Sequence, residues 1–507
     1  MIRLKILLLI SMVGLCCFAK DIKEEQQKPN ILFIFADDQT YNTLGSLEEC
    51  PVKTPNLDRL AEQGVRFSHT YNMGSFTPAV CVASRCMLNT GSFVWRAATF
   101  SSKGNNMNDP NAPKNMPIYT VPKLKSQGYW PQWMKQAGYE TYMSGKWHVE
   151  VKASDVFDHT VHVRGGMPRQ TKAGYNRPQS PEDYENGWKP WDKANGGFWE
   201  GGKHWSEVLG DDGVAFLEQA KESDHPFFMY LAFNAPHDPR QSPKRFVDMY
   251  PLDEVDVPEN FLPEYPYNEY AGTGRTLRDE KLAPFPRTEY SVKVNRQEYY
   301  AIITHMDEQI GRILDALEAS GKAENTYIFF TADHGLAVGE HGFMGKQNMY
   351  DCSMRVPMLI VGPGLEAGKV VDAPVYLQDI MATTLDLAGA KKPKQVDFNS
   401  LLPLASGKTN NSVYHNIYGA YFGVQRMIRT DKYKMIIYPT ANKVRLYDMV
   451  NDPLEMNDLA EGKTRPDKLM RKLFKEYQLL QKQMNDPIDV SEAFNNFMNN
   501  VAPSPIQ

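Results

Sequence analysis

Residues 30–39 read NILFIFADDQ, an apolar run that ends in two acidic residues. A short, continuously apolar segment of this kind is typical of a strand buried on both faces of a mainly parallel sheet. The next segment, TPNLDRLAEQG at residues 54–64, predicts a helix. Thr54 can cap it, Pro55 suits its first position and Gly64 suits its exit. A strand followed directly by a helix is the repeating unit of α/β folds.

The same alternation recurs further along the chain. Apolar runs at residues 227–233, 327–331 and 358–361 predict strands. Residues 298–319 predict the longest helix, because apolar side chains recur there at helical spacing. We therefore expect an α/β sandwich with a mainly parallel central sheet, in which ligands gather at the carboxyl ends of the strands.

The chain changes character after about residue 400, where short alternating segments predict antiparallel strands and a closing amphipathic helix. We expect a catalytic domain over residues 20–400 and a smaller α+β subdomain with an antiparallel sheet over residues 401–507. Within the larger domain, residues 150–210 predict a long irregular insertion, rich in glycine, proline and charge. Its tryptophans could stack on sugar rings or anchor the loop to the body; they are Trp188, Trp191, Trp199 and Trp205.

Composition and the first residues narrow the class of protein. The chain has 56 basic and 61 acidic residues, a net charge of -5, which argues against a generally basic nucleic-acid binder. Residues 1–19 combine two basic residues with a short apolar run and a final alanine, the layout of a secretory signal peptide. A membrane anchor or, through Cys16 and Cys17, a lipoprotein are the alternatives. Later segments lack a span for a bilayer, so we expect an exported protein, periplasmic, cell-surface or secreted.

Acidic and histidine residues follow three of the expected strands. Asp37 and Asp38 end the first, His237 follows the second, and Asp333 and His334 follow the third. Because the carboxyl ends of parallel strands meet at one edge of a sheet, these side chains are expected to converge. Carboxylates with an imidazole suit a divalent cation, although a single Asp at a strand end is more often a turn former.

A candidate nucleophile lies in TPAVCVASRCMLNTG at residues 77–91. Cys81 is placed where a helix is expected to begin, and a helix N-terminus lowers the pKa of a thiol and stabilises anions. Arg85 follows four residues later, on the same helical face. The pattern favours a reactive cysteine beside a cation, with a small buried thiol as the alternative.

The segment Cys81-Val82-Ala83-Ser84-Arg85, with CMLNTG after it, resembles the signature of the type I sulfatases, in which the cysteine is oxidised to formylglycine. Ala83 stands where the usual family pattern has proline. Further blocks resemble the same family over most of the chain after residue 19: NILFIFADDQ, TPNLDRLAEQGVRF, SGKWH at 144–148, 227–239, 331–335 and Gly345-Lys346. The resemblance implies an alkaline-phosphatase-like α/β sandwich and a sulfuric ester hydrolase.

The resemblance also implies a metal site and a mechanism. A calcium ion, with magnesium as the alternative, would be held by Asp37, Asp38, Cys81, Asp333 and His334. Lys146, Lys346 and Arg85 would offset the charge of the sulfate. One hydroxyl of the hydrated formylglycine would attack sulfur, while His237 protonates the leaving oxygen and His148 deprotonates the second hydroxyl to release sulfate. A formylglycine-generating maturation enzyme is the implied partner.

The substrate is less well defined by the sequence. Six residues flank the expected site and could contact substrate: Asp238, Arg240, Glu340, His341, Gln347 and Asn348. Export and the tryptophan-rich insertion favour a sulfated glycan, and choline sulfate is an alternative. Two other classes stay open, a phosphate or phosphonate ester hydrolase of the alkaline-phosphatase-like group and a catalytically silent glycan-binding relative.

Overall fold

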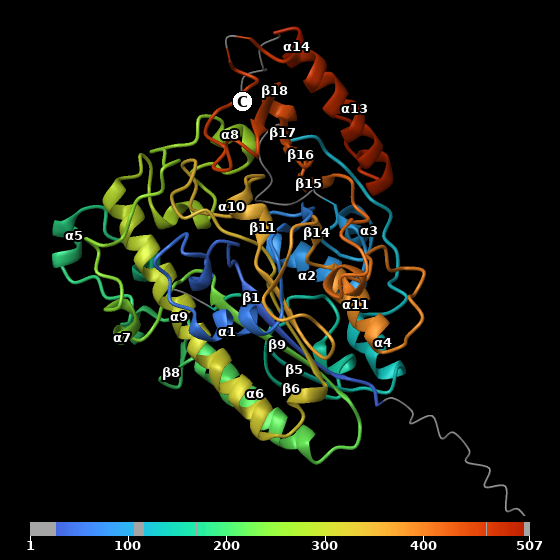
Figure 1. Cartoon of the computed structure of the whole chain (residues 1–507). Coiled ribbons are helices and arrows are strands. Elements are labelled where there is room, and N and C mark those ends of the chain that lie inside the picture. The colour runs from blue at the N-terminus through green and yellow to red at the C-terminus, as the bar shows by residue number, and fades with distance from the viewer. Residues whose placement is uncertain (1–26, 106–115, 169–170, 176, 463, 501–507) are drawn as a thin grey trace, which may run out of the picture.

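The computed structural model describes residues 27–105, 116–168, 171–175, 177–462 and 464–500. Its central element is a sheet of eight strands (Figure 1). In spatial order these are β13 (Lys369–Val371), β2 (Val65–Phe67), β12 (Met358–Val361), β10 (Thr326–Ala332), β1 (Asn30–Asp37), β9 (Phe227–Pro236), β5 (Glu140–Lys146) and β6 (His159–Arg164). All neighbours run parallel except those of β12. The predicted α/β sandwich with a mainly parallel sheet is confirmed, and the segment at 1–19 lies outside the described residues.

Helices cover both faces of the sheet (Figure 1). One face carries α1 (Pro55–Gln63), α6 (Trp205–Lys221) and α9 (Glu289–Ala319), and the other carries α2 (Val80–Thr90), α4 (Trp130–Gln136) and α11 (Asp379–Leu387). The central strand β1 is completely buried, as a strand between two helical layers must be. Its apolar run is therefore the centre of the core.

Two sequence expectations about helices need correction. Helix α9 begins at Glu289 and not at residue 298, because its first turns bury polar side chains such as Asn295 and so lack an apolar period. Pro55 does open α1, but Thr54 makes no cap hydrogen bond. Its hydroxyl instead accepts a hydrogen bond from the N–H of Gly45 at 2.7 Å.

The C-terminal part of the chain forms a second, antiparallel sheet (Figure 1). Its strands are β18 (Lys443–Asp448), β17 (Tyr433–Tyr438), β16 (Gln425–Arg429) and β15 (Ile417–Tyr421), with α13 (Asp467–Met484) and α14 (Ser491–Met498) beside them. The short β4 (Gly74–Ser75) adds to β15 in parallel. A side chain at Gly74 would collide with the carbonyl of Ala420, so a glycine lets the two parts of the chain meet seven residues before Cys81.

Shorter elements complete the described chain. The helices are α3 (Val94–Thr99), α5 (Pro181–Glu185), α7 (Lys244–Val247), α8 (Asn268–Ala271), α10 (Asp351–Met354) and α12 (Leu402–Ala405). The strands are β3 (Thr70–Tyr71), β11 (Arg355–Val356), β14 (Val375–Tyr376), β7 (Trp199–Glu200) and β8 (Lys203–His204). Across the residues that are placed, none of the helices combines the length and the apolar character that crossing a membrane requires.

The four tryptophans of the insertion are half-buried, and each has a cation over its ring. The pairs are Trp188 with Arg177, Trp191 with Lys244, Trp199 with Lys193 and Trp205 with Arg164. The indole N–H of Trp188 also donates to Glu298 of α9 at 2.8 Å. These contacts favour the interpretation that the tryptophans anchor the insertion.

A buried charge cluster ties the C-terminal sheet to α10 and gives a stability prediction. Lys434 of β17 is fully buried, and its Nζ lies 2.5 Å from Asp351 and 2.7 Å from Glu455. Lys434→Met removes the buried cation shared by these two carboxylates and leaves Asp351 a longer ion pair with Arg355 at 4.0 Å. We therefore expect a loss of about 3–5 kcal/mol in the free energy of unfolding. Denaturant unfolding measures it, with the solvent-exposed Lys432→Met as the control of little effect. An unchanged unfolding midpoint for Lys434→Met would refute a contribution of this charge cluster to stability.

Candidate active site

The carboxyl ends of three neighbouring strands bring acidic residues together with Cys81. Because β10, β1 and β9 pair in parallel, Asp37 at the end of β1 and Asp38 directly after it lie beside Asp333 after β10. Cys81 is the second residue of α2. One ligand atom from each of these four buried residues lies within 4.8 Å of all the others. Asp37 and Cys81 form a second such group with His237.

His334 does not join either group. Its Nδ1 lies 3.0 Å from the carbonyl oxygen of Gly335, and the ring is buried. Burial lowers the pKa of His334 to about 3, so the ring is neutral at ordinary pH. Its predicted role as a metal ligand stays a prediction.

Two buried lysines face the acidic pair. Lys146, the last residue of β5, hydrogen-bonds through Nζ to Oδ2 of Asp37. Lys346 does the same to Oδ2 of Asp38, and its Nζ lies 3.2 Å from Sγ of Cys81. Both lysines are at most 2% exposed, so they act as fixed positive charges and not as mobile surface groups. The positive charge of Lys346 beside residue 81 favours binding of an anion there.

Arg85 connects the nucleophile's helix to the acidic residues. It lies one turn after Cys81 on α2 and is completely buried. Its Nε donates to Oδ2 of Asp333 at 2.9 Å, and its Nη1 donates to the carbonyl oxygen of Lys146 at 2.6 Å. The guanidinium also stacks on the ring of Phe35. These contacts fix the start of α2 against the ends of β5 and β10.

The three carboxylates fit a divalent cation. Oδ1 of Asp37 and Oδ1 of Asp38 are buried and have no hydrogen-bond partner among the described residues. Burial raises the pKa of Asp38, and burial together with Asp37 raises the pKa of Asp333 to about 7. Crowded carboxylates of this kind are relieved by a shared cation. A donor set dominated by carboxylate oxygens suits calcium or magnesium better than a soft metal.

His237 is held between two carboxylates. Its Nδ1 lies 2.7 Å from Oδ1 of Asp238, and its Nε2 lies 3.4 Å from Oδ2 of Asp38. Burial lowers the pKa of His237, but the carboxylates outweigh that effect, against the charge of Lys346, and raise it to about 10. The imidazole is therefore a proton donor at neutral pH. Asp238 is only 3% exposed and contacts this ring, and its predicted role in substrate binding stays a prediction.

His148 follows β5, and its ring is neutral, unlike that of His237. Its backbone is left-handed, with φ of 54°, and its ring lies beside Gly166. Its Nδ1 is buried without a hydrogen-bond partner among the described residues. Burial, and the charges of Lys146 and Arg85, lower the pKa of His148 to about 2. The ring is therefore neutral with Nδ1 free of hydrogen bonds to the described residues, but its protonated form is disfavoured, so its predicted role as the proton acceptor stays a prediction.

The other residues predicted to contact substrate are held by protein groups. Glu340 is half-buried, and its backbone pairs with Phe261. The remaining four are buried, with hydrogen bonds from Arg240 to Asn295, between His341 and Asn260, from Gln347 to Asp279, and from the N–H of Tyr350 to Asn348. A substrate role for these five residues stays a prediction.

Two residues at the site were not identified from the sequence. The hydroxyl of Tyr175, from the insertion, donates to Oδ2 of Asp238 at 3.0 Å. Arg278 lies 3.2 Å from Nε2 of His237 through its Nη2. Both come from irregular segments without a hydrophobic period. The only available signal for Arg278 was the charged run Arg278-Asp279-Glu280 in a loop before a long helix.

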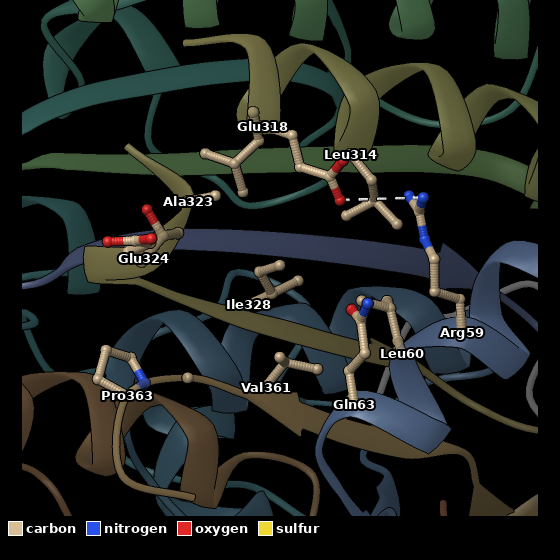
Figure 2. A pocket seen from close by; sticks show the side chains of 13 residues that line it. Arg59, Leu60, Gln63, Leu314, Glu318, Ala323, Glu324, Ile328, Val361 and Pro363 are labelled. Carbon is tan, nitrogen blue, oxygen red and sulfur yellow. Dashed lines mark ion pairs between the residues drawn. The ribbon is translucent and has the colours of Figure 1, made fainter. Parts of the chain in front are cut away.

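A cavity of about 330 Å³ lies away from this site. Figure 2 shows its apolar floor, which includes Leu60, Ile328 and Val361, and the ion pair of Arg59 with Glu318 at its rim. Ile328 is near the start of β10, whereas Asp333 follows the end of that strand. The cavity is therefore at the opposite end of the sheet from the candidate active site.

Comparison with known proteins agrees with this geometry. The "N-acetylglucosamine-6-O-sulfatase" of Bacteroides thetaiotaomicron is 27% identical, with 95% of this chain and 91% of that protein covered. A solved structure in complex with its substrate, D-glucosamine-2-N,6-O-disulfate, is 24% identical and has a TM-score of 0.67, covering 91% of this chain and 99% of that one. A phosphonate monoester hydrolase from Silicibacter pomeroyi, 20% identical, has a TM-score of 0.68 and covers 91% and 96%. At such identities the two structures show the fold alone.

Two family models match the sequence itself. The C-terminal model of N-sulphoglucosamine sulphohydrolase matches residues 339–483. The sulfatase model matches residues 29–390, which is well over half of the chain and contains every residue of the site described above. The chain therefore belongs to the sulfatase family and is a sulfuric ester hydrolase.

Proposed function

We propose that this enzyme removes O-sulfate groups from a sulfated glycan, with formylglycine at position 81 as its nucleophile and a divalent cation beside it. The observation that carries the proposal is the position of Cys81. Its Sγ belongs to the compact group with Asp37, Asp38 and Asp333 and lies 3.2 Å from Nζ of Lys346. Anionic ester, nucleophile and positive charges would thus meet at one point.

The cation would be held by the carboxylates of Asp37, Asp38 and Asp333, with residue 81 completing the set and His334 as a further candidate. Calcium is proposed, with magnesium as the alternative, because the available donors are hard oxygens. Bound there, the cation would offset the negative charge of the sulfate and polarise its oxygens. The Oδ1 atoms of Asp37 and Asp38, which accept no hydrogen bond from the described residues, support this position.

Formylglycine, once hydrated, supplies two hydroxyls on one carbon, one to attack sulfur and one whose deprotonation expels sulfate. The surrounding residues would bind the sulfate and transfer the protons. Lys146, Lys346 and Arg85 would bind and orient the sulfate by charge. His237 would donate a proton from Nε2 to the oxygen of the departing alcohol, and His148 would accept the proton of the second hydroxyl.

A glycan is proposed as substrate because a relative that covers 95% of this chain is named "N-acetylglucosamine-6-O-sulfatase". The insertion also brings the hydroxyl of Tyr175 to Asp238, the neighbour of His237. The sugar and the sulfate position stay open. Export, with a signal peptide at residues 1–19, and maturation by a formylglycine-generating enzyme belong to the same proposal. A glycan-degrading enzyme in a bacterium meets its polymeric substrate outside the cytoplasm.

The main rival is hydrolysis of phosphate or phosphonate esters, because a phosphonate monoester hydrolase shares the fold. A substrate panel discriminates between them: sulfated monosaccharides, 4-nitrophenyl sulfate, 4-nitrophenyl phosphate and 4-nitrophenyl phenylphosphonate. We expect kcat/KM to be highest for a sulfated sugar. A preference for the phosphonate would refute the proposal, and binding of sulfated sugars without turnover would favour a silent glycan-binding protein.

Removal of the cation gives a prediction with two readouts. We expect a chelator to abolish sulfate hydrolysis and to lower the melting temperature, because a cation at 100 times its Kd stabilises the fold by about 2.7 kcal/mol. Calcium and magnesium are then added back separately, and activity and melting temperature are measured. Asp37→Asn should show no stabilisation by either ion. Equal melting temperatures for the wild type with and without both ions would contradict the site.

A further inference from the structure

One arginine at the mouth of the site has no role in the mechanism above. Arg278 lies in the loop before α9, and its side chain is 46% exposed, whereas those of His237 and Asp238 are 1% and 4% exposed. Its Nη2 lies 3.2 Å from Nε2 of His237 and 3.5 Å from Oδ1 of Asp238. It is therefore the solvent-facing end of a chain of groups that leads to the proton donor.

The guanidinium of Arg278 is held in place by neighbouring protein groups. Its Nε donates to Oδ1 of Asp279 at 2.9 Å, and Oδ2 of Asp279 accepts a hydrogen bond from Nε2 of Gln347 at 2.9 Å. The next residue, Glu280, is buried and accepts hydrogen bonds from the N–H groups of Met344 and Gly345 at 3.2 and 3.0 Å.

These contacts fix the Arg278 loop to the segment that carries Lys346. Since Nζ of Lys346 touches Cys81, Arg278 keeps a defined position relative to the nucleophile. A group fixed in this way loses little conformational entropy when it binds substrate. The arrangement is therefore that of a preorganised donor and not of a mobile surface side chain.

The two nitrogens, Nη2 of Arg278 and Nε2 of His237, are close enough to share one acceptor. An oxygen at ordinary hydrogen-bond distance, about 2.9 Å, can lie within reach of both. The proton donor must contact the oxygen of the departing alcohol. The same oxygen therefore comes within reach of Arg278.

We propose that Arg278 is a further catalytic residue, which donates a hydrogen bond to the leaving oxygen of the sulfate ester beside His237. The proposal rests on the proposed function. The nucleophile's oxygen forms a bond to sulfur, the bond between sulfur and the alcohol oxygen breaks, and its electron pair stays on that oxygen. The proton comes from His237, while Arg278 keeps all of its protons.

This role matters most for alkyl esters such as sugar sulfates. The oxygen of a departing sugar carries more developing charge than that of a nitrophenol, because its conjugate acid is far weaker. A fixed donor at that oxygen is worth about 10²–10³-fold in kcat. A role only in the packing of the site would act on all substrates alike. A role only through Asp238 and His237 would leave Arg278→Gln without a further effect in a His237→Gln background.

The test compares leaving groups in the full-length matured enzyme. Arg278→Gln and Arg278→Lys are assayed with phenyl sulfate, 4-nitrophenyl sulfate and the sugar sulfate that the wild type hydrolyses best. We expect Arg278→Gln to lose about 10²-fold in kcat or more on the sugar sulfate, less on phenyl sulfate, and only a few-fold on 4-nitrophenyl sulfate. Arg278→Lys should recover part of the loss, since it keeps the charge but not the fork of the guanidinium.

Arg275→Gln is the matched control. Arg275 lies in the same loop, is 57% exposed and pairs with Glu264 at 2.9 Å, outside the site. Arg275→Gln should leave kcat on all three substrates unchanged. Equal losses on the three substrates in both Arg278 variants, with unchanged melting temperatures, would overturn the proposal. A wild type without activity on any sulfate would instead overturn the proposed function.

Discussion

Replacement of Cys81 by alanine is expected to lower kcat/KM for every sulfate ester by at least about 10⁴-fold, since removing a covalent nucleophile leaves only binding and electrostatics. The fold should remain, because Cys81 is buried at the start of α2 and alanine fits there without a new contact. Binding of sulfate should persist through Lys146, Lys346 and Arg85. The measurement is steady-state hydrolysis together with sulfate binding.

Cys81→Ser separates the two halves of the reaction. A serine has one hydroxyl, so it can attack sulfur but has no second hydroxyl to expel sulfate. We expect at most one equivalent of alcohol released per enzyme, and then no turnover. Cys50→Ala, at a partly exposed free cysteine whose thiol donates to the carbonyl oxygen of Asn42, is the matched control and should keep full activity.

The mass of the peptide that contains residue 81 tests whether the cysteine is converted to formylglycine. In the wild type purified from its own host, we expect residue 81 to have lost sulfur and gained oxygen. A wild type that retains the thiol and is still fully active would contradict the formylglycine proposal. A wild type that retains the thiol and is inactive would favour the silent binding protein.

The sequence is informative about the site because the site lies at strand ends. Asp37, Asp38, His237 and Asp333 each follow a continuously apolar run, and parallel pairing alone brings such positions to one edge. Cys81 could be placed at a helix start from TPAVCVASR without any structure. The central sheet and the compact acidic group were predicted on these grounds, and the structure has both.

The rest of the site depends on contacts between irregular segments, which have no period to recognise. Arg278 is placed by Asp279 and Gln347, and the pairing of β4 with β15 involves only two residues. Likewise, the hydroxyl of Tyr175 reaches Asp238 from the insertion, a contact that the sequence does not indicate. Such contacts follow from packing in three dimensions, so spacing along the chain contains little information about them.

His237→Gln is expected to remove the proton donor with little change in size. General acid catalysis is worth about 10²–10⁴-fold, and we expect a loss of that order for sugar sulfates. For 4-nitrophenyl sulfate the loss should be much smaller, because nitrophenolate leaves without a proton. His225→Gln, at the exposed segment before the amino end of β9, is the matched control and should have no effect on either substrate.

The pH dependence of the rate tests the same role of His237 as the proton donor. The carboxylates around His237 raise its pKa to about 10, so the ring is protonated at neutral pH and loses its proton only as the pH rises through that value. The wild-type rate on a sugar sulfate should therefore fall on the alkaline side, and His237→Gln should lack that fall at its lower rate. An alkaline fall of the same midpoint in both enzymes would assign it to another group, since a glutamine cannot titrate.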